Sequence, residues 1–377
     1  MKPAIVVLTT VYKPFLGGAE IAIEEIAKNL RGEFDFYILT ARLKRNLPAR
    51  EKTPEGTIIR LGLGTNLDKL LLPFLIFWEL LSPSVTADWK LKDRKFLLWG
   101  VMVSYASIGA FLVKLFNPKI PFILAIQEGA EEWKFRLRTL GFSWLWWRII
   151  FKKADHVTAI SRYLLYKVRD LNYNGPATLV PNGVPEKLLS ISVLPMNEPP
   201  VIFSASRLVE KNGIDLLLEA CGRLKNFFSF RIILAGDGPD KKYLMKLAKG
   251  LDLEDRVKFL GEVPYAELPV YYKEADIFVR PSRTEGLGNA FLEAMAAGVI
   301  TVGTRVGGTS DFLYEGKTGF LAWPNDIEDL ADAIRIALTL APQKRDEIIL
   351  NARKEIQARF LWITVSNQMK EIFVQLL

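Results

Sequence analysis

The stretch RPSRTEGLGNAFLEAMAAG, residues 280–298, joins the end of an apolar segment to a Gly-rich turn and then to a helical pattern. DIFVRPS (276–282) leads into the turn, and VITVGT (299–304) follows the helix as a second apolar run. Strand, helix and strand in this order predict a parallel βαβ unit. The same stretch places two carboxylates, Glu285 and Glu293, eight positions apart across the turn.

The alternation of strand and helix patterns extends through both halves of the chain. Further strands are predicted at 5–10, 34–40, 121–126, 155–160, 201–207, 231–238 and 257–261. Helical spacing follows most of them, with Ser161 as an expected N-cap and a long amphipathic helical pattern over 344–377. A Pro-rich segment at 179–200 breaks the rhythm and is interpreted as an interdomain connection. The pattern predicts an α/β fold with two doubly wound parallel sheets.

Length and composition agree with two folded domains. The chain has 377 residues, of which half are apolar and a quarter charged. The single cysteine, Cys221, excludes a disulfide within the chain and favours a reducing compartment. The first apolar run ends at Thr9, which is too short for a signal-peptide core, and the run at 70–81 is shorter than the roughly 20 residues that cross a bilayer.

Positive charge gathers in the first half of the chain. Residues 1–190 carry a net charge of +10 and seven of the nine tryptophans, whereas residues 191–377 carry −2. A basic, Trp-rich face is typical of contact with an anionic membrane surface or nucleic acid, and an ordinary basic domain is the alternative. Segment 133–153 mixes cations with four tryptophans, so we predict peripheral membrane contact there, with a Trp-rich core helix as the alternative.

The carboxyl ends of the predicted strands in the second half carry residues suited to a diphosphate. In parallel sheets these ends meet at one edge, where ligands bind. The residues in question are Arg207, Lys211, the turn Gly236-Asp237-Gly238, and the loop from Glu285 to Gly288. Gly288 and Asn289 begin a helix, whose N-terminal amides attract anions. We expect Glu293, in the first helical turn, to accept a diol such as a ribose, although solvated charges and helix-dipole compensation are the alternatives.

Seven segments of the chain form a recognisable set of motifs. They are GGAE (17–20), VPNGV (180–184), SRLVEKNGIDLLLEA (206–220), ILAGDGP (233–239), FLGEVP (259–264), residues 281–298 and VGGTSDFLYEGKTGFLAWPND (306–326). Together they resemble the retaining glycosyltransferases of family 4, whose GT-B architecture has two Rossmann-like domains facing a cleft. The resemblance covers nearly the whole chain. It implies an N-terminal acceptor domain over 1–185, a nucleotide-sugar domain over 196–360, and a final helix at about 361–377 that packs back onto the first domain.

The resemblance also implies a role for each matching residue. Glu285 would hydrogen-bond the donor sugar, Arg207 and Lys211 would neutralise the diphosphate leaving group, and Glu293 would bind the ribose. The remaining donor-binding positions would be Gly17, Gly18, Gly236, Val263, Gly286, Leu287, Gly288, Asn289 and Ala290. Gly17 and Gly18 would reach the distal phosphate when the domains close about the 181–200 connection. The sequence has no Asp-x-Asp motif at a predicted strand end, so we expect no metal and no further cofactor.

One position departs from the family pattern. Family members often place a histidine after the strand that corresponds to 121–126, and this chain has Gln127 there. Its only histidine, His156, lies inside a strand pattern and is expected to be structural. A mechanism with a histidine base is therefore disfavoured, and Gln127 is expected to position the sugar or acceptor. Front-face displacement, usual for the family, needs leaving-group stabilisation and no protein nucleophile.

The predicted function is retaining transfer of a sugar from a UDP- or GDP-sugar to a hydroxyl acceptor. We expect a lipid-linked or cell-surface glycan precursor as the acceptor, an anionic membrane surface as a further partner, and no nucleic acid. The expected location is cytoplasmic, including the inner face of the membrane. A non-catalytic nucleotide-sugar-binding subunit and, more remotely, a sugar-nucleotide epimerase are the alternatives. A dehydrogenase is disfavoured because AGDGPDKKYL lacks the third glycine of the dinucleotide fingerprint.

Overall fold

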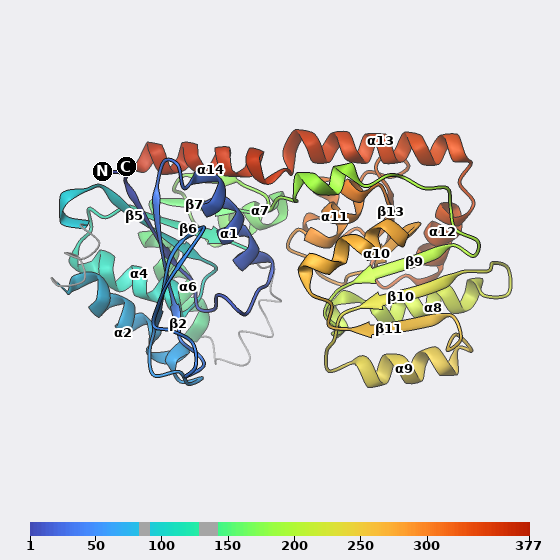
Figure 1. Cartoon of the computed structure of the whole chain (residues 1–377), viewed down its shortest axis with the longest axis horizontal. Coiled ribbons are helices and arrows are strands. Elements are labelled where there is room, and N and C mark those ends of the chain that lie inside the picture. Colours follow the sequence, from blue (N-terminus) through green and yellow to red (C-terminus); the bar gives the residue numbers. More distant parts are fainter. Residues whose placement is uncertain (83–90, 128–141) are drawn as a thin grey trace. The chain divides into compact units, whose positions relative to one another are not determined.

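The computed structural model describes residues 1–82, 91–127 and 142–377, without the side chains of Lys92 and of 142–147. The chain forms two compact units (Figure 1). The N-terminal unit comprises Met1–Asn182 together with Trp362–Leu377, and the C-terminal unit comprises Gly183–Leu361. Each unit is described by itself.

The N-terminal unit is built on a sheet with the strand order β3-β4-β2-β1-β5-β6-β7-β8. Its strands are β1 (Ala4–Leu8), β2 (Asp35–Ala41), β3 (Arg50–Thr53), β4 (Gly56–Leu61), β5 (Phe96–Val101), β6 (Phe122–Ile126), β7 (His156–Ala159) and β8 (Ala177–Leu179). All neighbours pair in parallel except β3 and β4. Its helices are α1 (Gly18–Leu30), α2 (Asp68–Leu81), α4 (Tyr105–Phe116), α6 (Phe142–Lys153), α7 (Arg162–Asp170) and α14 (Trp362–Leu376).

Local signals in the sequence explain several of these elements. Every residue of β1 is buried, as expected for a central parallel strand covered on both faces. The predicted N-cap of α7 is confirmed, because the Ser161 side chain accepts a hydrogen bond from the amide of Leu164 at 3.3 Å. Parallel strands that are buried on both faces give apolar runs, which is how most of the central strands were predicted, although β5 was missed.

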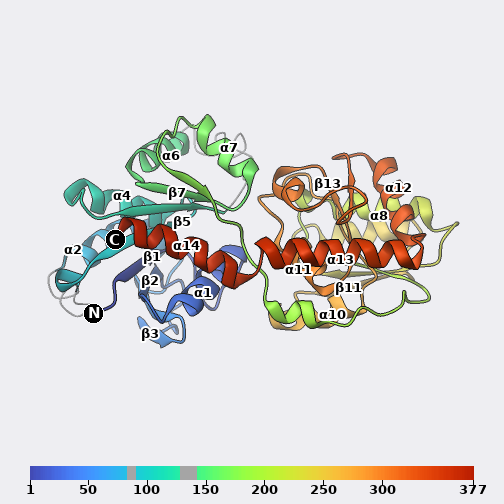
Figure 2. The same cartoon turned by 90° about the horizontal axis from the view of Figure 1, so that it is seen from above.

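The last helix of the chain belongs to the N-terminal unit. α14 packs along α1, where Asn29 Nδ2 donates to Ser366 Oγ at 3.1 Å (Figure 2). The ring of Phe373 packs in edge-to-face geometry against those of Phe34, Phe36 and Trp99. These contacts build the end of the chain into the core beneath β1 and β5.

The C-terminal unit has the strand order β11-β10-β9-β12-β13-β14, with parallel neighbours throughout. The strands are β9 (Val201–Ala205), β10 (Arg231–Ala235), β11 (Val257–Gly261), β12 (Ile277–Arg280), β13 (Ile300–Thr304) and β14 (Phe320–Ala322). The helices are α8 (Ile214–Leu224), α9 (Lys241–Gly250), α10 (Leu268–Glu274), α11 (Asn289–Ala297), α12 (Ile327–Leu338) and α13 (Pro342–Arg359). Figure 1 shows α10 and α11 on one side of the strands and α8 and α9 on the other.

The order of these strands indicates the edge of the sheet at which a ligand would bind. Numbered within the unit it is 3-2-1-4-5-6, the arrangement of dinucleotide-binding sheets. The chain reverses its direction of winding between β9 and β12, and ligands bind beside the carboxyl ends of strands at such a switch point. The prediction of two parallel-sheet α/β domains is confirmed.

The helical pattern predicted over 344–377 divides into two helices. α13 ends at Arg359 and α14 begins at Trp362. Between them, the Phe360 carbonyl accepts a hydrogen bond from the Val184 amide at 2.7 Å, and Leu361 forms a bridge with Val184. Because this backbone pairs with a segment far away in sequence, apolar periodicity alone did not reveal the break.

Candidate active site

Two loops meet at the switch point of the C-terminal sheet. One follows β9 and carries Arg207 and Lys211, and the other follows β12 and carries Glu285. The Arg283 amide donates to the Lys211 carbonyl at 2.7 Å. Gly213 has a φ of +68°, and a Cβ there would lie 2.0 Å from the Pro281 carbonyl oxygen, so only glycine permits this approach.

Glu285 is held by an arginine that the sequence did not single out. Arg280, the last residue of β12, contacts Glu285 Oε2 through Nη2, and both side chains are nearly buried. The same Nη2 donates to Asn212 Oδ1 at 3.3 Å, which ties the carboxylate to the β9 loop. Glu285 Oε1 also accepts from the Gly286 amide at 3.2 Å, and Ser282 Oγ donates to Oε2 at 3.4 Å. This arrangement fixes one carboxylate at the carboxyl end of β12.

Glu293 lies deeper, on α11. The helix begins at Asn289, so the prediction that Glu293 stands in its first turn is wrong, and the residue starts the second turn. Its side chain is only 5% exposed, and the Tyr272 hydroxyl donates to Oε2 at 2.7 Å. Burial raises the pKa of Glu293 to about 7, against the lowering effects of hydrogen bonds from Tyr272 and Tyr265 and of the Arg280 charge. Helix-dipole compensation does not account for so buried a carboxyl group.

The backbone between the two carboxylates forms the start of α11. Gly288 precedes the helix with a φ of +93° and offers no side chain to cap it. The first amides of a helix lack intrahelical partners and carry a partial positive charge, which suits phosphate oxygens. Leu287 is buried, so this residue presents its backbone, as Gly286, Asn289 and Ala290 were also predicted to do.

The two predicted cations differ from this buried set in their exposure. The side chains of Arg207 and Lys211 are both exposed at the β9 loop. The Arg207 carbonyl accepts from Asn212 Nδ2 at 2.6 Å, so the loop that carries the cations is fixed by the same Asn212 that contacts Arg280. Both charges therefore stand on an ordered loop next to the start of the Glu285 loop.

Gly236 and Val263 lie on the neighbouring loops. Gly236 follows β10 with a φ of +137°, and a Cβ there would lie 1.9 Å from the Ser206 carbonyl oxygen. Its amide donates to the Gly261 carbonyl at 2.7 Å, which joins the β10 loop to the end of β11. Val263 follows two residues later and is half-buried. The requirement for glycine at position 236 is thus explained by packing against the β9 loop.

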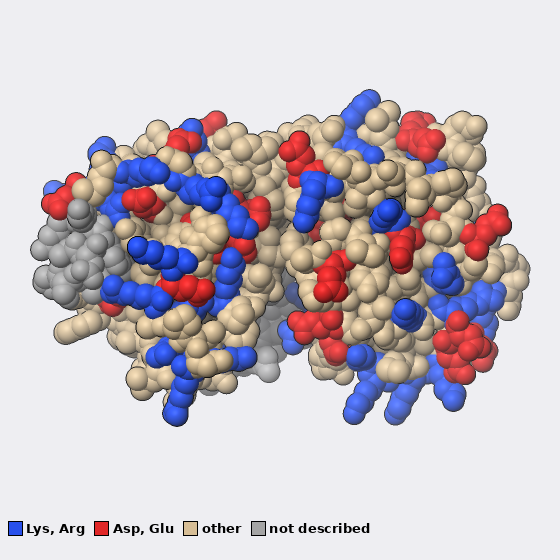
Figure 3. All heavy atoms as spheres, in the orientation of Figure 1, with Lys and Arg blue, Asp and Glu red and all other residues tan. Residues whose placement is uncertain are grey.

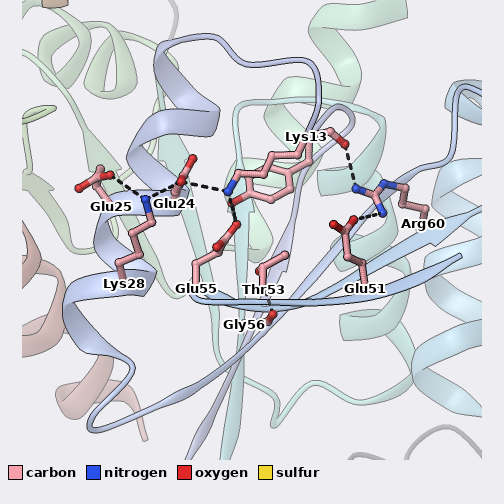
Figure 4. A network of polar contacts seen from close by, with 10 residues as sticks. Lys13, Glu24, Glu25, Lys28, Glu51, Thr53, Glu55, Gly56 and Arg60 are labelled. Carbon is pink, nitrogen blue, oxygen red and sulfur yellow. Dashed lines mark hydrogen bonds and ion pairs between the residues drawn. The ribbon is translucent and has the colours of Figure 1, made fainter. Parts of the chain in front are cut away.

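Gly17 and Gly18 belong to the N-terminal unit, where Gly17 ends the loop after β1 and Gly18 is the first residue of α1. Both are exposed, and the Gly17 amide donates to Glu20 Oε2 at 2.8 Å. Gly17 has a φ of −125°, so its conformation is open to any residue. The preceding residues are anchored by a polar network, in which Lys13 Nζ pairs with Glu24 at 3.0 Å and with the buried carboxylate of Glu55 (Figure 4).

Gln127 follows β6 in the same unit. Its Oε1 accepts from Asn182 Nδ2 at 2.9 Å, and Asn182 lies in the VPNGV motif. His156, in contrast, is buried inside β7, with Nε2 and Thr178 Oγ1 2.9 Å apart. Burial lowers the pKa of His156, so the ring is neutral near neutral pH.

Gly307 is a further residue of the site. It lies in the motif at 306–326, but no role was predicted for it from the sequence. It has a φ of +52°, and a Cβ there would lie 1.7 Å from the Glu285 carbonyl oxygen. The loop after β13 thus packs directly on the backbone that carries the carboxylate. A contact between residues 22 positions apart leaves no local signal in the sequence.

We expect Gly307→Ala to displace the Glu285 loop, lowering both thermal stability and any transferase activity. Strain at positive φ alone costs about 1–3 kcal/mol, and the clash adds to it. Gly316→Ala is the matched control, because Gly316 has a φ of +65° with open space around it. Equal decreases in melting temperature for Gly307→Ala and Gly316→Ala would contradict the packing argument.

Residues 1–82, 91–127 and 142–377 contain no group of three or more His, Cys, Asp or Glu side chains arranged to hold a metal ion. None of the helices in these ranges is long and apolar enough to cross a membrane. Of the predicted membrane segment 133–153, residues 133–141 and the side chains of 142–147 lie outside the described residues.

Two parallel-sheet units, one of them with an anion-suited switch point, define the GT-B architecture. The chain belongs to the family 4, group 1 glycosyltransferases: the model described as Glycosyltransferase Family 4 matches residues 16–188, and the model described as Glycosyl transferases group 1 matches residues 189–355.

A relative with a known name agrees with this family. A GDP-mannose-dependent α-(1-6)-phosphatidylinositol monomannoside mannosyltransferase from Mycolicibacterium smegmatis is 33% identical over 147 residues, covering 37% of this chain and 38% of that protein. The matches span less than half the length of the first curated relatives.

Two solved structures share the fold. Sucrose-phosphate synthase from Thermosynechococcus elongatus has a TM-score of 0.82 and 22% identity, covering 100% of this chain and 99% of that one. Anabaena HepE in complex with UDP-glucose has a TM-score of 0.72 and 21% identity, covering 99% of each chain. At these identities the likeness supports the fold alone.

Proposed function

We propose that this protein is a retaining glycosyltransferase that moves a sugar from a nucleotide-diphosphate sugar to a hydroxyl acceptor. The observation that carries the proposal is the spacing of Glu285 and Glu293 around the start of α11. One carboxylate lies at the carboxyl end of β12, the other is buried one helical turn into α11, and anion-suited amides lie between them. A diphosphate over these amides would direct sugar and ribose toward opposite carboxylates.

The remaining residues of the C-terminal unit complete the donor site in this proposal. Arg207 and Lys211 neutralise the diphosphate, the arginine being able to hold two oxygens at once. Glu293 accepts hydrogen bonds from the ribose hydroxyls, and the backbone from Gly261 to Val263 borders the base. Arg280 positions Glu285, because its contacts with Glu285 and Asn212 fix the carboxylate against the β9 loop.

Transfer then proceeds by front-face displacement. The acceptor oxygen bonds to the anomeric carbon on the face from which the diphosphate leaves, and the anomeric carbon–oxygen bond breaks with its electron pair on the phosphate oxygen. That oxygen takes the acceptor proton, so a protein base is not required. Glu285 orients the sugar hydroxyls and stabilises positive charge that develops on the ring, while Arg207 and Lys211 stabilise the departing diphosphate. Gln127 positions the sugar or acceptor from the N-terminal unit.

A lipid-linked or cell-surface glycan precursor is the proposed acceptor class. The support is the name of the mycolicibacterial relative, which acts on a phosphatidylinositol mannoside with GDP-mannose. HepE was solved with UDP-glucose, so both UDP- and GDP-sugars are candidate donors. A non-catalytic nucleotide-sugar-binding subunit is the second candidate, favoured by Gln127 at the position where the family often has a histidine.

The proposal is tested by a thermal-shift panel of UDP-, GDP- and ADP-sugars, followed by analysis of the product. A true donor at 100 times its dissociation constant should stabilise the protein by about 2.7 kcal/mol. The stabilising donor is then incubated with lipid-linked glycan acceptors, and NMR of the new linkage should show the anomeric configuration of the donor. Binding without transfer would favour the non-catalytic subunit, and an inverted product would exclude the proposed displacement.

A further inference from the structure

Helix α2 is apolar on both of its faces. One face packs into the N-terminal unit through Leu72, Pro73, Ile76 and Leu80, all of them buried. A surface helix normally turns polar residues to the solvent on its other side. The other face of α2 is instead formed by Leu67, Leu70, Leu71, Phe74, Trp78 and Leu81, which we call the α2 apolar face.

All six side chains of the α2 apolar face are exposed to solvent. Phe74 is 66% exposed and Trp78 is 75% exposed, and the other four side chains are between 41% and 65% exposed. The six positions follow helical spacing and occupy one sector of about 100°, in which no polar residue interrupts them. Phe116, at the end of α4, is also exposed and extends the surface, since its ring lies 5.0 Å from that of Phe77 on α2. A contiguous apolar surface of this kind marks an interaction site.

Among the described residues, the charges noted beside this face are cations or paired acids. Of the two acids on α2, Asp68 is buried and accepts three backbone amides, and Glu79 pairs with Arg50 at 3.7 Å. Lys44 and Arg45 are exposed, and the backbone of both lies against Gly64, just before the helix. Residues 1–190 as a whole carry a net charge of +10. Figure 3 shows Lys and Arg side chains on the surface of the N-terminal unit.

We propose that the α2 apolar face docks on the surface of an anionic lipid bilayer. A helix of 14 residues is about 21 Å long, which is shorter than the roughly 30 Å hydrocarbon core, so it would lie in the interface. Trp78 and Phe74 are side chains that favour the membrane–water boundary, and the flanking cations would meet lipid phosphates.

A second copy of the chain is a poorer occupant of this surface. Two such faces packed together would bring the exposed cations Lys44 and Arg45 of both copies to one interface, where like charges repel. An anionic bilayer supplies both an apolar layer and negative charge. The proposal stands apart from the donor site, because docking requires neither Glu285 nor a nucleotide-sugar.

Vesicle flotation of the full chain tests the proposal. The wild-type protein should float with phosphatidylcholine vesicles that contain phosphatidylglycerol, more at low salt than at high salt. Phe74→Ser combined with Trp78→Ser should lower the bound fraction at least about tenfold, since these two side chains supply much of the buried apolar area. Phe227→Ser is the matched control, because Phe227 is 79% exposed in the C-terminal unit. Circular dichroism and melting temperature verify that each variant folds.

A fluorescent label gives a second, local measurement. Leu71→Cys and Phe227→Cys are labelled with an environment-sensitive dye, and the native Cys221 is buried and inert. Vesicles should shift the emission at position 71 to the blue and leave position 227 unchanged. The proposal is overturned if the wild type binds no anionic vesicles, if the double variant floats as well as the wild type, or if sedimentation shows a wild-type dimer that the double variant loses.

Discussion

Replacing Glu285 with alanine should lower the turnover of sugar transfer about a hundredfold or more, because its contact with the sugar is expected to strengthen as the ring becomes cationic. The KM for the donor should change much less, since diphosphate and ribose contacts remain. Steady-state kinetics with the donor identified by thermal shift would measure both quantities. Glu285→Gln keeps the shape of the side chain and removes its charge, so it separates electrostatic stabilisation from packing.

A matched control is needed because Glu285 pairs with a nearly buried arginine. Glu355 offers the same chemistry on α13, where its half-buried carboxylate contacts Arg359. Glu355→Ala should leave turnover close to that of the wild type while breaking a comparable ion pair. Near-normal turnover in Glu285→Ala, or an equal loss in both variants, would show that Glu285 does not act on the reacting sugar.

Most central strands of this fold were predictable because they are buried on both faces, whereas β5 and the strands β3, β4, β8 and β14 were missed. Runs such as Val201–Ala205 and Ile300–Thr304 are buried throughout and mostly apolar or β-branched, so they stand out without any alternation. α2 was not recognised as a helix for a related reason. A helix that is apolar on both faces has no polar stripe, and the apolar periodicity that identifies amphipathic helices disappears.

The residues of the candidate site that could be predicted are those that local sequence patterns place at the ends of strands. Glu285, Arg207 and Lys211 follow strands directly, and parallel strands bring their carboxyl ends to one edge. Arg280 and Gly307 were missed because their roles depend on contacts between loops. The Arg280 side chain contacts Glu285 and Asn212. Gly307, which has no side chain, leaves room for the Glu285 carbonyl oxygen. Glu293 was placed in the first turn of α11, but the helix already begins at Asn289, directly after the left-handed Gly288, so Glu293 starts the second turn.

The burial of Glu293 should make the stability of the unliganded protein depend on pH. Its pKa rises from 4.5 to about 7 in the folded state because burial disfavours the charged form. Below pH 4.5 the Glu293 carboxyl is mostly neutral in both the folded and the unfolded protein, and its contribution to the free energy of unfolding is present in full. This contribution is lost progressively as the pH rises from 4.5 toward 7. The loss attributable to this group is about 3 kcal/mol, and it levels off above pH 7.

Nucleotide binding should respond to pH in the opposite direction. Ribose hydroxyls donate hydrogen bonds, so they are expected to favour the ionised Glu293 carboxylate. Affinity for the nucleoside diphosphate of the donor should be constant above pH 7 and fall up to about tenfold per pH unit below it. Titration calorimetry across this range measures the effect, with phosphate ionisation of the free nucleotide subtracted as a reference.

Variants of Glu293 and Tyr272 make this prediction specific. Glu293→Ala should weaken nucleotide binding by about 1.5–3 kcal/mol at pH 8, the loss typical of a charge-assisted hydrogen bond. Glu293→Gln should remove the pH dependence. Tyr272→Phe should move its midpoint to higher pH, because the Tyr272 hydroxyl that donates to the carboxylate lowers the pKa of Glu293. Tyr265 and Arg280, which also lower this pKa, remain in place in that variant. If the pH profile of Glu293→Gln were the same as that of the wild type, another group would cause the pH dependence. The ribose would then be assigned to a residue other than Glu293.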